Sequence, residues 1–337
     1  MDYPVAPVIR EALEKRIVTD LGYPMWDEQS SPPPLVEAFA HRMETRYRWR
    51  PDPSHARAFT DLNQALQVLL HHLTEPGEPI ALHTPAYVAF VATLAEMNRP
   101  ILPIPMLPDG DSWRFELPDV TGCHILLLVN PHNPTGRAFT RAELTEIADL
   151  AERHDLLVIS DEIHADLTFA PHEHIPFATL LPDRTITLTS ASKAFNLGGV
   201  RCAVAHIGPA HVRKQLSDMP GMLYGEANVF GVEATIAAWT HGGPWLAETM
   251  KTLDANRHTL ADRLPKTIGY RLPEATYLAW LDFGHPDAAE KVEQRAKVLL
   301  SPGKSFGPGG DHYARLNFAT HPEILEEILD RLSAVAE

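Results

Sequence analysis

The stretch TITLTSASKAFNLGGVRCA, from Thr185 to Ala203, places a lysine at the point where an apolar run ends. Residues 185–189 have the β-branched and apolar composition of a buried strand, and three small residues follow before Lys193. A lysine on a solvated turn would explain this position without any chemistry. The alternative is a partly desolvated lysine with a lowered pKa, which acts as a nucleophile and forms a Schiff base.

Short apolar runs alternate with helical patterns through the middle of the chain. The runs at 125–130, 156–160, 185–189 and 201–207 are typical of strands in a parallel sheet that helices cover on both faces. Residues 140–154 fit a helix in which Thr140 is the N-cap and Glu143 completes a capping box. The sequence therefore predicts an α/β fold with a mostly parallel sheet sandwiched by helices.

The pattern changes near residue 244, where a long helix is predicted over 244–264. A half-polar strand, TYLAWLDF, and a last helix over 322–336 follow it. This succession is typical of a smaller α+β unit. We expect residues 36–243 to form a large domain, and residues 1–35 and 244–337 to form a small one.

Composition excludes several classes of partner. The 337 residues carry a formal net charge of −15, which argues against nucleic acid and anionic membranes as partners. The 18 histidines are scattered without the spacing of metal ligands, so we expect no metal site.

The same composition indicates a cytoplasmic protein. No apolar run is long enough to cross a bilayer, and the N-terminal MDYPVAPVIREALEKRI lacks the pattern of a signal peptide. The two cysteines, Cys123 and Cys202, lie in apolar surroundings and cannot form a disulfide framework, as expected in a reducing compartment.

Polar clusters follow three of the predicted strands where each strand ends: NPHNPTG at 130–136, SDEIH at 160–164 and SASK at 190–193. In open α/β sheets the ligand site lies at the carboxyl ends of the strands. We therefore expect these clusters to meet in one site.

The three clusters contain the groups that pyridoxal 5′-phosphate (PLP) requires. Asp161 is either a helix N-cap or a buried carboxylate that keeps the ring nitrogen protonated, so that the ring withdraws electrons from the substrate Cα. Lys193 can form an imine with the cofactor aldehyde and later act as a base. Asn133 can donate to the ring's phenolate oxygen, although an isolated Asn-Pro turn would look the same. Tyr87, in TPAYVAF, can stack on the ring, although a lone tyrosine there is also an ordinary core residue.

A phosphate would find partners close to Lys193. The hydroxyls of Ser190 and Ser192 can bind phosphate oxygens, and Arg201 can supply a bidentate contact. The pair Gly198-Gly199 either lets the chain approach a ligand closely or makes a turn. Each of these sequence signals is weak alone, but together they are specific for a PLP site.

With these residues the chain resembles the fold-type I PLP enzymes, the aspartate aminotransferase superfamily. The motifs NPTG, SDEIH and SASKAFN look most like the MalY/PatB-type cystathionine β-lyase branch, also called cysteine-S-conjugate β-lyases. The resemblance covers essentially the whole chain, from MDYPVAPVIREAL to ARLNFAT. It implies an aspartate-aminotransferase-like fold, PLP as cofactor and an amino acid as substrate.

The resemblance also assigns roles to matching residues. His164 stands where many aminotransferases have a tyrosine that bonds the ring oxygen, and a histidine there is typical of the lyase branch. The remaining roles follow the motifs: Lys193 resembles the Schiff-base lysine, Asp161 the pyridinium partner, Asn133 the donor to the ring oxygen, Tyr87 the stacking aromatic, and Ser190 and Arg201 the phosphate ligands.

Three further roles rest on the resemblance alone. The backbone at Asp61-Leu62 matches the phosphate-binding helix N-terminus, where an acid is unfavourable unless its side chain turns away. Tyr23, in LGYPMW, resembles the tyrosine that reaches the phosphate of the neighbouring subunit, which implies a homodimer with shared active sites. Arg315, in YARLNF, matches the arginine that binds the substrate α-carboxylate in a bidentate manner.

The implied reaction is α,β-elimination from cystathionine or another cysteine S-conjugate, which gives pyruvate, ammonia and a thiol. Transamination of an amino acid is the alternative, and it uses the same residues; His164 and the whole-chain resemblance favour the lyase. A non-catalytic or regulatory descendant is a further class, against which the intact set of catalytic residues argues. Similar enzymes carry a few tens of residues before the segment matching Met1, so a truncated sequence, a misassigned start or a real loss that opens the site would each account for this start.

Overall fold

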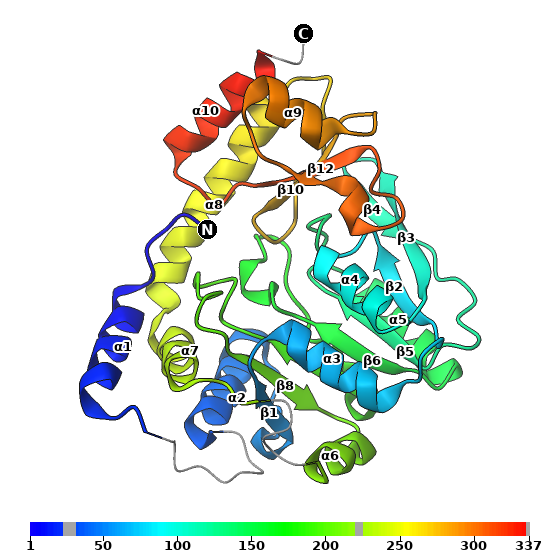
Figure 1. Ribbon diagram of the computed structural model, residues 1–337, viewed down its shortest axis with the longest axis vertical. Helices are drawn as coiled ribbons and strands as arrows, with labels where there is room; N and C mark the ends of the chain where they lie inside the picture. Colours follow the sequence, from blue (N-terminus) through cyan, green and yellow to red (C-terminus); the bar gives the residue numbers. More distant parts are fainter. Residues whose placement is uncertain (23–31, 220–224, 335–337) are drawn as a thin grey trace.

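The largest unit of the chain is an eight-stranded sheet with the order β1-β8-β7-β6-β5-β2-β3-β4 (Figure 1). The computed structural model describes residues 1–22, 32–219 and 225–334. The strands are β1 (Ala56–Phe59), β2 (Ile80–Thr84), β3 (Ile101–Asp109), β4 (Ser112–Phe115), β5 (Ile125–Val129), β6 (Leu157–Asp161), β7 (Thr185–Thr189) and β8 (Ala203–Ile207).

The centre of this sheet is parallel and its two edges are antiparallel. Strands β3, β2, β5, β6 and β7 pair in parallel, whereas β8 is antiparallel to β7 and β1 is antiparallel to β8. The apolar run at 201–207 is thus a strand, as predicted, but not a parallel one. Residues 190–202 contain no helix that could carry the chain across the sheet, so the chain returns beside β7 in the opposite direction.

Strand β5 shows why the central runs are continuously apolar. Ile125, Leu127 and Val129 belong to a buried cluster with helices α3 (Leu62–Leu73) and α4 (Val88–Glu96). Leu126 and Leu128 point the other way, into a cluster with helix α5 (Arg141–Arg153). Successive side chains of a strand face opposite sides, so both faces of the sheet are buried. The predicted helix-covered sheet is confirmed.

The capping box predicted for α5 is also present. Thr140 Oγ1 accepts a hydrogen bond from Glu143 N at 3.3 Å, and Glu143 Oε2 accepts one from Thr140 N at 2.7 Å. These two bonds satisfy backbone donors that the first turn of a helix leaves without partners.

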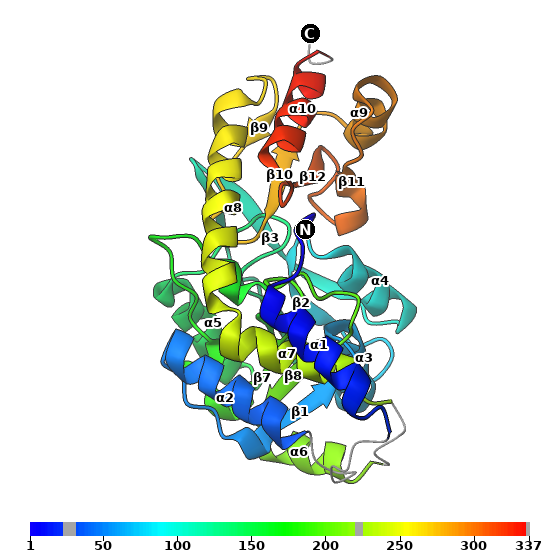
Figure 2. The same cartoon turned by 90° about the vertical axis from the view of Figure 1, so that its left-hand side faces the viewer.

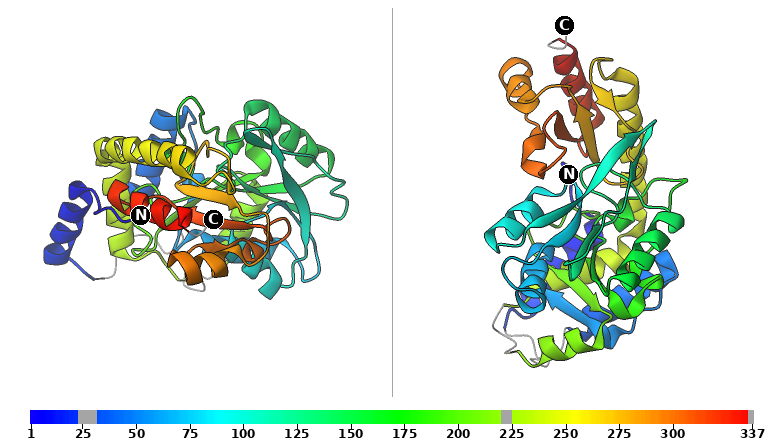
Figure 3. Two further views of the ribbon diagram at one scale, coloured as in Figure 1. Left: turned by 90° about the horizontal axis from the view of Figure 1, so that it is seen from above. Right: turned by 90° about the vertical axis from the view of Figure 1, so that its right-hand side faces the viewer.

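A second, antiparallel sheet has the order β11-β12-β10-β9. Its strands are β9 (Gly269–Tyr270), β10 (Leu278–Asp282), β11 (Ser301–Pro302) and β12 (Tyr313–Asn317), and the helices around it are α8 (Gly243–Arg263), α9 (Ala288–Ala296) and α10 (Pro322–Ser333). Helix α8 runs from beside the large sheet up to this small sheet (Figures 1 and 2). The small sheet and its helices lie above one end of the large sheet in the right-hand view of Figure 3, and the left-hand view looks down on them from above.

The N-terminal segment touches both parts. Helix α1 (Pro7–Thr19) packs against α7 (Val229–His241), which lies beside α2 (Pro33–Tyr47) (Figure 2). The preceding residues bond to the C-terminal part, because Asp2 N donates to Ala319 O at 2.9 Å and Tyr3 OH to Thr320 O at 2.6 Å. The remaining helix beside the sheet is α6 (Ala210–Ser217).

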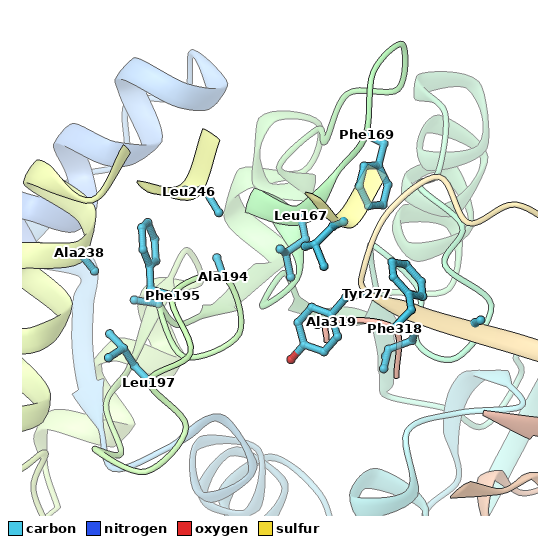
Figure 4. Close-up of a cluster of buried hydrophobic side chains, with 14 of the residues drawn as sticks. Leu167, Phe169, Ala194, Phe195, Leu197, Ala238, Leu246, Tyr277, Phe318 and Ala319 are labelled. Carbon is cyan, nitrogen blue, oxygen red and sulfur yellow. The ribbon is translucent and has the colours of Figure 1, made fainter. Parts of the chain in front are cut away.

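One buried apolar cluster extends from the segment after Lys193 to the small sheet (Figure 4). Ala194, Phe195 and Leu197 lie at one end of it, and Tyr277 and Phe318 at the other. The position of Lys193 is therefore tied to packing on both sides of the molecule. Across the part of the chain that is described, no helix has the length and apolar character to cross a membrane.

Candidate active site

A cavity of about 410 Å³ opens where the parallel strands β5, β6 and β7 end. Asp161 is the last residue of β6, and it pairs in register with Val129 on one side and Leu188 on the other. The polar clusters that follow these strands consequently meet. Eleven residues that the sequence singled out line the cavity: Asp61, Leu62, Tyr87, Asn133, Asp161, His164, Ser190, Ser192, Lys193, Gly198 and Arg201.

Asp161 is a buried carboxyl group with one main-chain hydrogen bond. Its side chain accepts from Ile163 N at 3.0 Å, and the residue is 4% exposed. Burial raises the pKa of Asp161 to about 7, against the opposing effects of the Ile163 bond and the charge of Lys193. A protonated ring nitrogen beside it would favour the ionised form, so this acid suits a pyridinium partner.

Lys193 has the electrostatic environment of a nucleophilic amine. Burial lowers its pKa, and the charges of Arg315 and Arg201 act in the same direction, whereas Asp161 opposes them. A larger fraction of the amine is neutral at a given pH than for a lysine on the surface. Only the neutral form can attack an aldehyde or accept a proton.

Asn133 and Arg315 are in direct contact. Arg315 Nη1 donates to Asn133 Oδ1 at 3.0 Å, which orients the amide so that its Nδ2 group is left as a donor. The guanidinium carbon lies 4.8 Å from the centre of the Phe306 ring, and Nη2 is 3.4 Å from Ser301 Oγ. Arg315 thus stands beside the cavity, within reach of the asparagine that faces it.

His164 is a neutral, buried histidine. Its pKa is lowered to about 3, first by burial and then by the charges of Lys193 and Arg315. Its Nδ1 atom is buried and has no hydrogen-bond partner among the described residues. The ring stands edge-on to Tyr277, with 5.8 Å between ring centres. A neutral imidazole can donate one hydrogen bond to an acceptor in the cavity.

The other end of the cavity is suited to an anion. It faces the first turn of α3, where backbone N–H groups lack partners within the helix. Asp61, the N-cap, does not turn its carboxylate away from this turn: Oδ1 accepts from Gln64 N at 3.0 Å, and Oδ2 forms an ion pair with Arg201. The unfavourable acid that the sequence presents is thereby neutralised.

Ser190 is already engaged within the chain. Its Oγ donates to Cys202 O at 2.6 Å and accepts from Ser192 N at 3.0 Å. These bonds shape the turn before Lys193. Ser192 also lines the cavity, so it is the better placed of the two serines to offer its hydroxyl to a phosphate.

Tyr87 precedes α4 and lines the cavity, with its ring edge-on to Phe90 at 5.3 Å between centres. Sequence reasoning missed a group of polar residues on α3 that also line the cavity: Asn63, Gln64 and Gln67. Their three- and four-residue spacing, just after the proposed anion site, is the signal that would have found them. Tyr23 lies outside the described residues.

The donor set fits PLP. Between them the side chains offer an amine for the aldehyde, an acid for the ring nitrogen, an amide donor for the ring oxygen, and a helix N-terminus with Arg201 for the phosphate. Within the described ranges, no group of three or more histidine, cysteine, aspartate or glutamate residues could hold a metal ion.

This fold and this site define a PLP-dependent enzyme of fold type I. The chain belongs to the family described as aminotransferase class I and II, whose model matches residues 5–332. The predicted fold and family are therefore confirmed, whereas the roles of individual residues remain predictions.

Individual relatives are similar along nearly the whole chain. It is 31% identical to cystathionine beta-lyase PatB of Bacillus subtilis, over 99% of this chain and 90% of that protein. It is 32% identical to Protein MalY of Escherichia coli, over 94% of this chain and 85% of that protein. Among solved structures, the PLP-bound C-S lyase of Staphylococcus hominis superposes with a TM-score of 0.92 and 27% identity, covering 99% of this chain and 89% of that one.

Proposed function

We propose that this protein is a PLP-dependent C–S β-lyase that acts on cystathionine or another cysteine S-conjugate. The observation that carries elimination rather than amino transfer is the similarity to PatB over 99% of the chain. The geometry supports amino-acid chemistry on PLP in general, since Lys193 and the buried Asp161 line one cavity, and Arg315, which we propose binds the substrate carboxylate, contacts the lining residue Asn133.

Each end of the cofactor would have its own partners. Lys193 would hold it covalently, Asp161 would face the ring nitrogen, and Asn133 with His164 would face the ring oxygen. Tyr87 would stack on the ring. The first turn of α3 at Asp61 and Leu62, with Ser190, Ser192 and Arg201, would hold the phosphate. Bound there, PLP supplies an electron sink for the charge left at the substrate Cα when its proton is removed.

The side chains would divide the remaining work. Arg315 binds the α-carboxylate and so orients the Cα–H bond toward Lys193, whose Nζ accepts the proton. The Cβ–S bond then breaks, and its electron pair leaves with sulfur as a thiolate that takes up a proton. One substrate molecule and one water give a thiol, pyruvate and ammonia.

We further propose a cytoplasmic homodimer in which Tyr23 of each subunit reaches the phosphate held by the other. Three exposed apolar side chains at the end of α1 and shortly after it support a surface that a second subunit covers: Ile17, Val18 and Leu21 are 57%, 80% and 57% exposed. The two cysteines are free and buried, as in reducing compartments. The molar mass in solution from light scattering tests the dimer; a monomer at micromolar concentration contradicts it.

We also propose a division into a large part, 36–243, and a small part, 1–35 with 244–337. The bonds from Asp2 and Tyr3 to Ala319 and Thr320 support placing the N-terminus with the C-terminal part.

The decisive assay offers L-cystathionine to the PLP-loaded protein and measures pyruvate, with amino transfer to a keto acid measured in parallel. We expect pyruvate to form. Steady amino transfer without pyruvate would establish the aminotransferase alternative, and a protein that cannot bind PLP would establish a non-catalytic descendant.

The variant Lys193→Ala tests the central residue. We expect pyruvate formation to fall by about 10³-fold or more, because Lys193 is the proposed base. Lys214→Ala is the matched control, since Lys214 is 76% exposed and forms a surface ion pair with Asp218. Retained turnover in Lys193→Ala would remove the assigned role.

A further inference from the structure

The segment 273–277 joins the small sheet to the turn that carries Asn133. The N–H groups of Glu274 and Ala275 both donate to Gly136 O at 2.9 Å. On its other side the segment is bonded to the chain that follows β6, because Thr276 N donates to Leu167 O at 2.9 Å. The backbone of 273–277 is thus held between two parts of the large sheet's carboxyl edge.

Gly136 shows how closely these two segments approach. Its φ is +72°, and a Cβ atom there would lie 2.4 Å from Pro273 Cβ and 3.0 Å from Ala275 O. A side chain would therefore push segment 273–277 away from the turn. The contact is a built feature of the fold.

The side chain of Glu274 reinforces the contact. Its carboxylate accepts from Ala138 N at 2.9 Å and from Ser112 Oγ at 3.1 Å, and it forms an ion pair with Arg137. Both charged side chains are largely buried, at 13% exposed for Glu274 and 10% for Arg137. Arg137 Nη2 also donates to both carboxylate oxygens of Glu143, Oε1 at 2.9 Å and Oε2 at 2.8 Å. A buried carboxylate with this many donors holds its neighbours in a single geometry.

The two segments carry the groups that contact cofactor and substrate. Asn133 stands three residues before Gly136, on the same turn. Segment 273–277 leads into β10, where Trp280 pairs in register with Arg315 of β12. Arg315 returns to Asn133 through its 3.0 Å hydrogen bond. The turn and the small sheet are therefore joined by two contacts. Arg315 bonds to Asn133 beside the cavity, and Glu274 bonds to Ala138 farther along the same turn.

We propose that Glu274, together with Arg137, is a positioning residue that sets the placement of Arg315 relative to Asn133. Glu274 touches neither substrate nor cofactor; it acts by fixing residues 136–138 against the segment that precedes β10. The inference rests on the proposed function only in that Arg315 binds an amino-acid carboxylate.

Binding of two amines to the PLP-loaded protein tests this role. L-Alanine carries a carboxylate and no leaving group, and L-alaninol lacks the carboxylate; both are followed by the change in cofactor absorbance. We expect Glu274→Ala to weaken L-alanine binding by about tenfold and to leave L-alaninol binding nearly unchanged, because a misplaced Arg315 affects only the carboxylate. Glu274→Gln keeps an acceptor for Ala138 N and should recover much of the loss.

Glu143→Gln is the matched control. Glu143 is the other carboxylate on Arg137 and caps α5, and within the described residues its side chain bonds to Arg137 and Thr140 rather than to segment 273–277. The Glu143→Gln substitution should lower thermal stability while leaving the binding constants for L-alanine and L-alaninol unchanged. Equal losses for both amines in Glu274→Ala, or the same pattern in Glu143→Gln, would overturn the proposal.

Hydrogen exchange of the cofactor-free protein tests the contact without any chemistry. The amides of residues 136–138 should exchange faster in Glu274→Ala than in wild type, and unchanged exchange would also overturn the proposal. If the wild-type protein binds L-alanine but forms no pyruvate from L-cystathionine, the lyase function is refuted and this inference is left intact.

Discussion

Arg315 Nη1 and Asn133 Oδ1 lie 3.0 Å apart although the two residues are separated by 182 positions in the chain. The bond joins β12 of the small sheet to the turn after β5 of the large sheet. The group proposed to bind the substrate carboxylate therefore also orients the amide proposed to face the ring oxygen. If both proposed roles hold, this one bond couples substrate binding to the cofactor contact.

Replacing Arg315 by lysine tests the carboxylate contact. Lysine keeps the positive charge but cannot form the two parallel hydrogen bonds of a guanidinium. Its ammonium group also lacks the planar set of donors that can bond a carboxylate and Asn133 at the same time. We expect KM for L-cystathionine to rise by roughly tenfold to a hundredfold. Arg263→Lys, at an exposed pair with Asp330, is the control. An unchanged KM in Arg315→Lys would show that another group binds the carboxylate.

Asp161→Asn tests the acid proposed for the ring nitrogen. Asparagine is close in size and keeps an oxygen for Ile163 N, but it cannot stabilise a positive ring nitrogen. We expect kcat to fall by roughly 10² or more while PLP still binds, because the ring would lose its protonated form. The measurement is pyruvate formation with saturating cofactor. Activity within a few-fold of wild type would reject the assignment.

The same residue predicts a pH dependence for the cofactor-free protein. Because burial raises the pKa of Asp161 to about 7, the folded state keeps its proton between pH 4 and 7 while the unfolded state loses it. The free energy of unfolding should therefore decrease as pH rises through this window, by about 4 kcal/mol at most. Urea unfolding at pH 5 and pH 8 should show about 3 kcal/mol of this loss in wild type and none of it in Asp161→Asn. Saturating PLP should reduce the difference, since a protonated ring nitrogen favours the carboxylate.

Asp61→Asn should tighten cofactor binding. Asparagine caps a helix about as well as aspartate, so α3 keeps its first turn. The change removes a negative charge beside the phosphate site and frees Arg201, whose side chain is 59% exposed in its pair with Asp61. We expect the PLP dissociation constant to fall about threefold at low salt and less at high salt. Asp52→Asn, an exposed cap elsewhere, is the control; weaker PLP binding in Asp61→Asn would mean that Asp61 holds Arg201 in place for the phosphate.

The sequence was sufficient for the parts of the site that follow strand ends. Lys193 and Asn133 follow β7 and β5, Asp161 is the last residue of β6, and these strands are neighbours in the sheet. Parallel strands bring their carboxyl ends to one edge, so local patterns were enough to predict that the three residues meet. Strand β1 is different: it has four residues at the sheet edge, three of them only half-buried, and no apolar run marks it.

Contacts between distant segments could not be predicted in the same way. The pair of Arg137 and Glu274 joins a turn to a segment far along the chain, and neither residue stands in a periodic pattern. The antiparallel direction of β8 depends on how residues 190–202 turn, which composition does not encode. Arg315 was found only through resemblance, because a single arginine in a half-buried strand carries no signal of its own.

His206 predicts a loss of stability in acid that is independent of the active site. It lies on β8 against Trp49, with 5.0 Å between ring centres, and both ring nitrogens are buried without a partner among the described residues. Burial lowers the pKa of His206, to about 4. The charges of His55 and Arg213 act in the same direction, whereas the charge of Asp52 opposes this shift. The unfolded chain binds this proton from about pH 6.5 downward and the folded protein only near pH 4, so stability should fall as pH decreases through that interval, by about 3 kcal/mol.

His206→Phe should remove this part of the acid sensitivity in urea unfolding at pH 7 and pH 4.5, because an apolar ring fits among aromatic neighbours. His211→Phe, at an exposed site on α6, should leave it unchanged, and an equal acid sensitivity in His206→Phe and wild type would contradict the assignment.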